Sequence, residues 1–356
     1  MDLVTQGVLG AAIGEAGFRK QLGDKAVMVG ALAGMLPDAD IVSGFFGQWQ
    51  SLIHHRGFTH SIFFAPLVAP LLGYLAWRWA KREGPVQQWM HLVFWALLTH
   101  PLLDLFTTYG TQLLTPFSSQ RFALDGISIV DPIYTIPLVL ALLIAKRTKE
   151  NPDIGRRVTA GALVLTTVYL GIGTLISQQT IRTSRQQLQP NFQPVAIRAT
   201  PTIFNVLLWR VLARDKNGDI KVGMHSTLHP RPILFHDLKH LDSPLLRKAM
   251  NSRKGKLLDW FADGYLSVEV LKHPKGTELI FHDQRFASLS APTRSFFKAT
   301  ASFDKKGKLF RFVRQQRDPR DVDFKKDFSL LWKMMTKGAP TPQPKAAKRK
   351  KQGKGV

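Results

Sequence analysis

Residues 158–181 read VTAGALVLTTVYLGIGTLISQQTI, and no side chain in this run carries a charge. An α-helix rises about 1.5 Å per residue, so the run is long enough to cross a hydrocarbon core about 30 Å thick. Three shorter charge-free apolar runs lie at about 61–77, 84–99 and 132–145. The sequence therefore predicts a protein embedded in a membrane.

Two weaker apolar runs, 3–14 and 26–36, contain glycines four residues apart, beginning at Gly10 and Gly30. This spacing lets membrane helices approach each other backbone to backbone. We therefore expect residues 1–180 to form a mainly α, membrane-embedded bundle of about six helices, with the weaker runs as packed interior helices or half-spans. The first residues lack the basic segment and cleavage site of a secretory signal, so we expect them to remain in the mature protein.

The two halves of the chain differ in charge. Residues 1–180 contain 13 Lys/Arg and 11 Asp/Glu, whereas residues 181–356 contain 36 and 14, so nearly all of the net charge of +24 belongs to the second half. Clustered Lys and Arg attract anionic surfaces, either bilayer phosphates or nucleic acid. We expect membrane lipids to be the partner and nucleic acid not to be, because a membrane lies next to this half. The sequence identifies no protein partner.

Basic residues between the apolar runs predict the orientation of the helices. They form three clusters, Arg19–Lys25, Lys81–Arg82 and Lys146–Arg157. If all six runs cross or enter the membrane, alternation places these clusters on one side, which the positive-inside rule makes cytoplasmic. We therefore expect a multi-pass protein of the bacterial inner membrane, with residues after 181 on the extracytoplasmic side.

The pattern changes to strands after about residue 185. Trp209–Ala213 and Ile220–Val222 flank an Asn-Gly turn, which predicts a β-hairpin. A helical stretch near 244–262 follows, and then further alternating runs. We expect residues 181–337 to form a basic α+β domain on an antiparallel sheet, and residues 338–356, rich in Pro, Lys and Arg, to form a disordered basic tail.

Asp and His gather in short segments of the first half. Asp38 and Asp40 follow the run 26–36, and His55 and His60 precede the run 61–77. His100 and Asp104 stand four residues apart at the end of the run 84–99, hence on one helical face. Each segment also has a local explanation, such as a polar turn, an interfacial imidazole or a helix cap.

Asp125 and Asp131 lie in a further segment of the same kind. Asp131 precedes Pro132, a pattern that also fits an N-cap with proline at the first helical position. Asp125 precedes Gly126, as turn residues do. The predicted topology nevertheless brings all these segments to one membrane face.

Several buried acids near one another cost several kcal/mol per unpaired carboxylate, and a divalent cation offsets that cost. The chain contains no cysteine, so we expect nitrogen and oxygen ligands, and these suit Zn²⁺ first, with Mn²⁺ or Fe²⁺ as alternatives. The candidates exceed one tetrahedral shell, so one or two ions are expected. The predicted ligands are Asp38, Asp40, His55, His60, His100 and Asp104.

Two further residues are predicted to be catalytic. Arg56 can bind an anionic substrate group, and Asp131 is a further acid on the same face. Thr59 or Ser61 can orient a neighbouring imidazole. The sequence contains no Gly-x-Ser-x-Gly elbow and no phosphate-binding loop, which disfavours serine hydrolases and nucleotide-driven enzymes.

Three segments together resemble the YdjM-type family of bacterial inner-membrane metal-dependent hydrolases. They read ALAGMLPDAD over 31–40, HRGFTHS over 55–61 and HPLLDLFTTYG over 100–110. The Asp131-Pro132 pair completes the likeness, which covers residues 1–180. The family often has Thr-His where this chain has Thr5-Gln6. The His-x-x-x-Asp element is also similar to part of the site in zinc-dependent phospholipase C, which implies phosphoester substrates by analogy.

These observations predict a metal-dependent, phosphoesterase-like hydrolase that acts on a lipid-like phosphoester or other ester near the membrane surface. A second hypothesis is a non-catalytic scaffold with a closed structural metal site and a basic lipid- or protein-binding domain. A third is an ion or proton path in a transporter, but residues 158–176 offer it almost no polar side chains. An open metal position beside a cleft distinguishes the enzyme from the scaffold.

Overall fold

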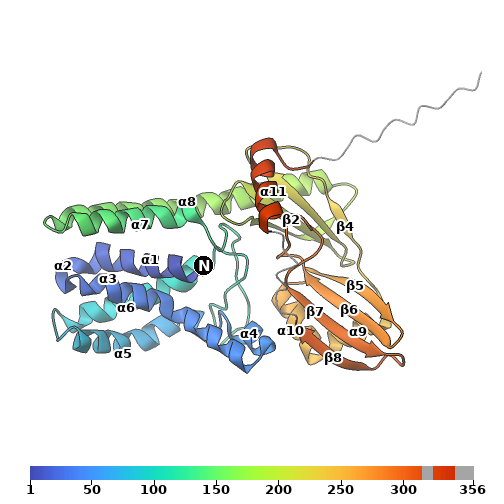
Figure 1. Cartoon of the computed structure of the whole chain (residues 1–356), viewed down its shortest axis with the longest axis horizontal. Helices are drawn as coiled ribbons and strands as arrows, with labels where there is room; N and C mark the ends of the chain where they lie inside the picture. The colour runs from blue at the N-terminus through green and yellow to red at the C-terminus, as the bar shows by residue number, and fades with distance from the viewer. Residues whose placement is uncertain (315–323, 341–356) are drawn as a thin grey trace, which may run out of the picture.

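The computed structural model describes residues 1–314 and 324–340, and it divides into a helical region and a C-terminal domain with two sheets (Figure 1). Four of the predicted apolar runs form the helices α5 (Phe64–Trp79), α6 (Val86–Asp104), α7 (Pro132–Arg147) and α8 (Pro152–Leu188). The N-terminal elements are α1 (Leu3–Ile13), the π-helix η1 (Gly14–Phe18), α2 (Arg19–Leu22) and α3 (Lys25–Met35). Between α3 and α5 lie the 3₁₀ segment η2 (Leu36–Phe46), α4 (Gln48–His54) and η3 (Phe58–His60).

Glycines bring α1 and α3 together, as their spacing predicts. A Cβ atom added at Gly10 would lie 2.1 Å from the carbonyl oxygen of Gly30, and one added at Gly30 would lie 2.2 Å from the carbonyl oxygen of Gly10. No larger residue fits at either position without moving backbone. This close packing places the N-terminal helix beside α3 and α6, where it reaches the polar end of the helical region.

By length and composition, two segments of the described chain are able to cross a membrane, Lys25–Phe46 and Pro152–Leu188. A third is added if the pair Gln48–His60 and Phe64–Trp79, bent by 69°, counts as one broken span. The expected number of about six membrane helices is therefore not confirmed. The apolar runs do form helices, but most are shorter or more polar than a full span requires.

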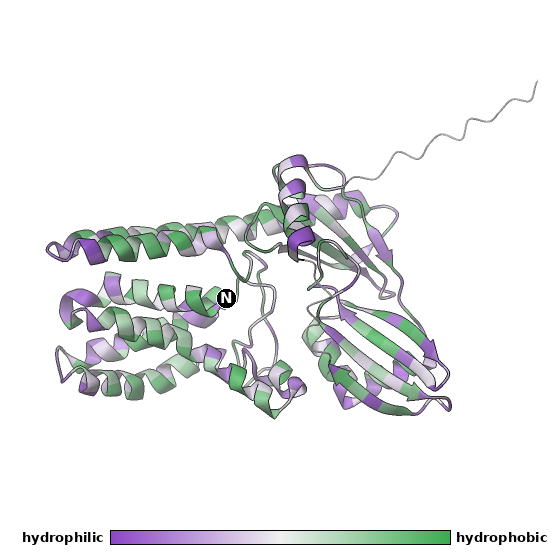
Figure 2. Ribbon diagram, viewed as in Figure 1, coloured by the Kyte–Doolittle hydropathy of each residue, from purple (hydrophilic) through white to green (hydrophobic). Residues whose placement is uncertain are grey.

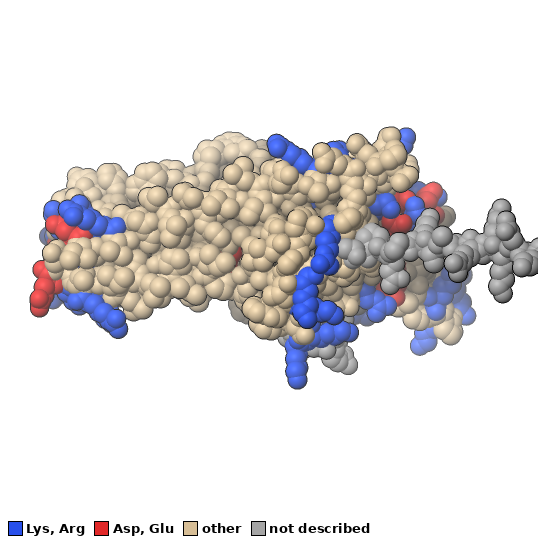
Figure 3. All heavy atoms as spheres, turned by 90° about the horizontal axis from the view of Figure 1, so that it is seen from above, with Lys and Arg blue, Asp and Glu red and all other residues tan. Residues whose placement is uncertain are grey.

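Charged residues avoid the middle of the helical region. Figure 3 shows Lys, Arg, Asp and Glu at one end of the helices and over the C-terminal domain, with a nearly charge-free belt between. At the charged end, Lys25 Nζ lies 3.0 Å from Glu83 and Lys149 Nζ lies 3.6 Å from Asp24, so the three basic clusters meet there. Most residues of these helices are apolar (Figure 2), and some of them are exposed, including Leu67.

The C-terminal domain contains two antiparallel sheets where the sequence predicted one. The first has the order β1-β2-β3-β4, with strands Pro194–Pro201, Leu208–Asp215, Ile220–Ser226 and His236–Leu238. The second has the order β5-β6-β7-β8, with strands Leu266–His273, Gly276–Asp283, Lys298–Asp304 and Leu309–Arg314. Between the sheets in sequence lie α9 (Pro244–Asn251) and α10 (Arg253–Ala262), and α11 (Phe324–Lys337) packs near β2. The hairpin predicted around the Asn-Gly turn is β2-β3.

The long helix α8 joins the two regions, because it pairs with α7 at one end and packs on β1 at the other (Figure 1). Ser177 Oγ on α8 donates to the carbonyl oxygen of Ala199 at 2.9 Å. Arg198 on β1 forms an ion pair with Asp125 in the loop after α6, at 2.8 Å. The C-terminal domain is thus fastened to the polar end of the helices. Of the predicted basic tail, 338–356, only residues 338–340 fall within the described part of the chain.

Candidate metal centre

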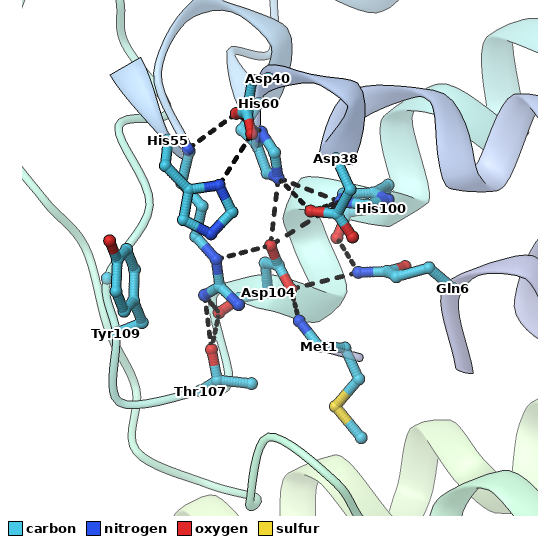
Figure 4. A network of polar contacts seen from close by, with 12 residues as sticks. Met1, Gln6, Asp38, Asp40, His55, His60, His100, Asp104, Thr107 and Tyr109 are labelled. Carbon is cyan, nitrogen blue, oxygen red and sulfur yellow. Dashed lines mark hydrogen bonds and ion pairs between the residues drawn. The ribbon is translucent and has the colours of Figure 1, made fainter. Parts of the chain in front are cut away.

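Four side chains from three elements converge at the end of the helices opposite the charged turns (Figure 4). Asp38 comes from η2, His60 from η3, and His100 and Asp104 from the last turn of α6. One possible ligand atom of each lies within 4.8 Å of those of the other three. The i, i+4 spacing in α6 turns its two residues to the same point, as the sequence predicted.

The two imidazoles direct the same ring atom at this point. His100 Nδ1 lies 2.6 Å from the carbonyl oxygen of Gly34 and therefore donates, which leaves Nε2 as the unprotonated nitrogen of a neutral ring. His60 Nδ1 lies 3.2 Å from Asp40 Oδ2 and takes the same form. The two Nε2 atoms are only 3.0 Å apart, so in these tautomers two lone pairs face each other. A bound cation would relieve that repulsion.

Asp104 supplies an oxygen that lacks a conventional partner. Among the described residues, no group makes a hydrogen bond to its buried Oδ2 atom. Oδ2 lies 3.3 Å from His60 Nε2, and it has an ion-pair contact of 3.0 Å with Arg56 Nε. Its other oxygen, Oδ1, accepts from Gln6 Nε2 at 3.1 Å and contacts the Met1 amine. Two imidazole nitrogens and two carboxylate oxygens, one without a hydrogen bond, fit a divalent cation of the zinc type.

Asp40 and His55 lie next to the four converging residues rather than among them. Asp40 accepts from His55 Nδ1 at 2.7 Å and from Thr59 Oγ1 at 3.0 Å, and it also faces His60 Nδ1. A carboxylate in this position fixes the orientation and tautomer of a metal-binding imidazole. Asp38, Asp40 and His55 nevertheless form a second group with ligand atoms within 4.8 Å of one another. Since Asp38 belongs to both groups, the six residues can accommodate one ion or two.

Arg56 lies directly at the cluster. Its backbone has a φ of +59°, and its N–H donates to Asp40 Oδ2 at 2.8 Å, so the turn after α4 is held by the same carboxylate. Its side chain donates to Thr107 Oγ1 at 2.7 Å and stacks over Tyr109, 5.1 Å from the ring centroid. The guanidinium is thus fixed beside Asp104, at the place where an anionic group next to the cluster would need a counter-charge.

Asp131 belongs to a different set of contacts. It caps α7 by accepting from the backbone N–H groups of Ile133 and Tyr134, and it accepts from the hydroxyl of Tyr169 at 3.0 Å. These are the contacts of the N-cap that the Asp-Pro pair also suggested. Its predicted catalytic role stays a prediction. Asp125, the other acid of that segment, pairs with Arg198 of the C-terminal domain.

Three residues at the cluster had no role in the sequence-based site. Gln6 holds Asp104, Thr107 holds Arg56, and Tyr109 stacks on Arg56 while its ring lies 5.2 Å from that of His55. Thr107 and Tyr109 fall within the segment 100–110 quoted above, but only their neighbours had the chemistry of metal ligands. Gln6 occupies the position where a histidine ligand was expected, and the structure places an amide donor there.

The family model described as YdjM inner membrane protein matches residues 1–180. The chain belongs to this family. The match to the YdjM family covers every residue of the cluster and confirms the resemblance carried by the motifs. It also supports an inner-membrane protein with apolar helices, whereas the number of spans and their sidedness are left open by the comparison.

Two curated relatives extend the YdjM assignment. The chain is 37% identical to the inner membrane protein YbcI of Escherichia coli K12 over 123 residues, which are 34% of this chain and 70% of YbcI. It is 35% identical to the uncharacterized protein YfhP of Bacillus subtilis 168 over 157 residues, which are 40% of this chain and 46% of YfhP. The chain therefore spans less than half the length of YfhP. No solved structure matches the chain.

Proposed function

We propose that this YdjM-family chain is a membrane-bound, metal-dependent hydrolase that attacks a phosphoester or other ester near the lipid surface. The observation that carries the proposal is the convergence of His60 Nε2, His100 Nε2 and Asp104 Oδ2, each buried and each prepared for a cation by its neighbours. Zn²⁺ is the expected ion, with Mn²⁺ or Fe²⁺ as alternatives.

The protein's own groups have distinct tasks in this proposal. A bound divalent cation would lower the pKa of water and polarise the ester oxygen. Gly34 and Asp40 hold the two imidazoles in orientation, and Gln6 holds Asp104. Arg56 supplies fixed positive charge for an anionic group of the substrate. Charge that is already oriented needs no reorganisation during the reaction, which is why buried donors of this kind are effective.

Exposure within the cluster supports an enzyme over a closed structural site. The side chains of His60, His100 and Asp104 are 0% exposed, whereas that of Asp38 is 15% exposed. The cluster can therefore be reached from the side of Asp38. A purely structural metal site has a full set of protein ligands and no side reserved for another molecule.

The direct test is hydrolysis by the purified full-length protein with and without metal. We expect activity on at least one member of a phosphodiester and carboxylester panel, its loss after chelation, and its return when Zn²⁺ or Mn²⁺ is added. Metal content is measured in the same samples by mass spectrometry. Bound metal that chelation does not remove, with no activity on any ester, would support the scaffold instead.

We also propose that the cluster and the C-terminal domain face the extracytoplasmic side, because the three basic clusters meet at the other end of the helices. The chain has no cysteine, so single cysteines introduced for labelling give an unambiguous signal. In intact cells, a membrane-impermeant maleimide should label Lys216→Cys and spare Lys81→Cys. The reverse pattern would invert the orientation.

A further inference from the structure

An apolar groove lies on the helical region, between α3, α5 and α6. Its volume is about 390 Å³, and side chains from Met28 to Leu36 form one wall while Leu72, Ala76 and Trp79 form the other. At one end, Trp79 lies near the charged turns, since its ring centroid is 5.9 Å from Lys25 Nζ. The groove therefore begins near the charged end and runs along α3 toward the polar end.

The surroundings of the groove define what can fill it. It lies on helices whose residues are mostly apolar (Figure 2), where the neighbouring medium of a membrane protein is hydrocarbon. From Met28 to Leu36 the chain rises about 12 Å, which is long enough to hold part of an extended acyl chain. The groove also follows the helices, which is the direction of lipid chains in a bilayer.

The lining of the groove ends close to the metal centre along the chain. Its last lining residue, Leu36, is separated from Asp38 only by Pro37. Asp38 is also the one member of the four converging residues whose side chain is partly exposed, whereas His60, His100 and Asp104 are fully buried. The most accessible member of the cluster therefore lies two residues along the chain from the last lining residue of the groove.

We propose that this groove holds an acyl chain of the substrate, whose phosphoester or ester head group lies at Asp38. The inference rests on the proposed function and narrows its substrate class to acylated lipids. Hydrocarbon gains little free energy on moving from lipid into an apolar groove, because both media are equally apolar. We therefore expect the groove to position the acyl chain rather than to bind it tightly. Narrowing the groove should then lower the rate at which the ester is attacked.

The test narrows the groove and compares two substrates. Ala76→Phe places a ring in the groove, and Ala160→Phe adds the same ring on an exposed position of α8 as a matched control. The assay uses a diacyl phospholipid in mixed micelles and a water-soluble p-nitrophenyl phosphodiester without acyl chains. We expect Ala76→Phe to lower kcat/KM for the phospholipid roughly ten- to hundredfold, with little change for the chainless ester and little effect of Ala160→Phe on either.

A second variant guards against misfolding. Leu32 lines the groove but is 61% exposed, so Leu32→Phe narrows the groove without crowding the core. Leu32→Phe should also lower kcat/KM for the phospholipid relative to kcat/KM for the chainless ester. Equal losses on both substrates, or no loss on the phospholipid, would overturn the proposed chain site even if hydrolysis itself is observed.

A binding measurement separates this inference from the proposed function. The full-length protein is placed in phosphatidylglycerol and phosphatidylethanolamine vesicles with a trace of phosphatidylglycerol bearing a photoreactive acyl chain. We expect crosslinks along 28–36 and 72–79 to exceed those on the exposed face of α8, and Ala76→Phe to reduce them, even if no ester is hydrolysed. Uniform labelling of all helices would refute an acyl-chain site.

Discussion

The C-terminal domain and the helical region each bury charged side chains, but these side chains are compensated in different ways. In the C-terminal domain, Arg210 on β2 is 5% exposed and donates to the backbone carbonyls of Gln284 and Pro292 and to the side-chain oxygen of Gln284, at 2.7 to 3.1 Å. Burial lowers the pKa of Arg210 to about 9. In the helical region, the Asp/His cluster brings two imidazole nitrogens face to face and leaves Asp104 Oδ2 without a hydrogen bond.

This difference in hydrogen bonding distinguishes a buried polar group with a structural role from a candidate binding site. The donors of Arg210 meet acceptors of the same domain, so this network holds the first sheet to the segment after β6 without any ligand. Protein groups compensate the cluster only in part, because Arg56 lies 3.0 Å from Asp104 Oδ2 while the ligand atoms of the four converging residues still face one point. A buried polar group whose hydrogen bonds are all made by the protein has a structural role. A buried polar group that still needs a cation to balance its ligand atoms indicates a binding site.

The largest effects should come from removing ligands at that point. His100→Ala and Asp104→Ala should each abolish stoichiometric metal binding and lower hydrolysis by roughly a thousandfold or more, because ligation and charge are lost together. Metal analysis of the purified proteins and the ester assay provide the measurement. Unchanged metal content in both variants would contradict the assignment.

Arg210→Met is the matched control for this comparison. It removes a buried charge that has protein partners, so it should destabilise the protein by about 1–3 kcal/mol through acceptors left unsatisfied. Metal content per folded molecule should be unchanged. If Arg210→Met loses metal, then metal binding depends on Arg210, and the two polar groups do not have separate structural and binding roles.

A smaller effect is expected for the carboxylate that holds His60. Asp40→Asn keeps the shape but weakens the contact to His60 Nδ1, so metal affinity should fall roughly ten- to hundredfold without being abolished. Competition with a chromogenic chelator measures this change. If Asp40→Asn instead removes one of two bound ions completely, Asp40 is a direct ligand.

The smallest predicted effect concerns packing. Gly10→Ala should destabilise the helical region by about 1–3 kcal/mol, because its Cβ would strike the backbone of Gly30. Gly17→Ala is the control, since a Cβ there meets no atom within 4 Å. Thermal aggregation in detergent compares the two variants with the wild type, and similar midpoints for both alanine variants would refute the backbone-to-backbone packing.

The sequence predicted the cluster better than it predicted the spans. The i, i+4 pair His100 and Asp104 and the polar segment around His60 carry local signals of ligand chemistry, and the topology brings them together. The number of spans depends on tertiary context, because short helices such as α3 continue into a 3₁₀ segment and α5 follows a sharp bend. Gln6 could not be assigned from its residue type, since an amide acquires a role only through the carboxylate it contacts.

The number of sheets in the C-terminal domain was also not predictable from the sequence. The Asn-Gly turn predicts β2-β3 because the turn chemistry is local. The division into two sheets depends on which strands pair across the intervening helices, and no local pattern encodes that choice. The pair formed by Arg198 and Asp125 likewise joins residues 73 positions apart, so neither partner could be identified from the sequence.

The unbroken helix α8 has a mechanical consequence. Its 37 residues correspond to about 55 Å of helix, and about 20 residues suffice to cross a bilayer. The remaining turns of α8 extend beyond the hydrocarbon core, and the first sheet packs on them through β1. A thinner or thicker bilayer that tilts α8 would therefore also tilt the first sheet, because β1 packs on this helix.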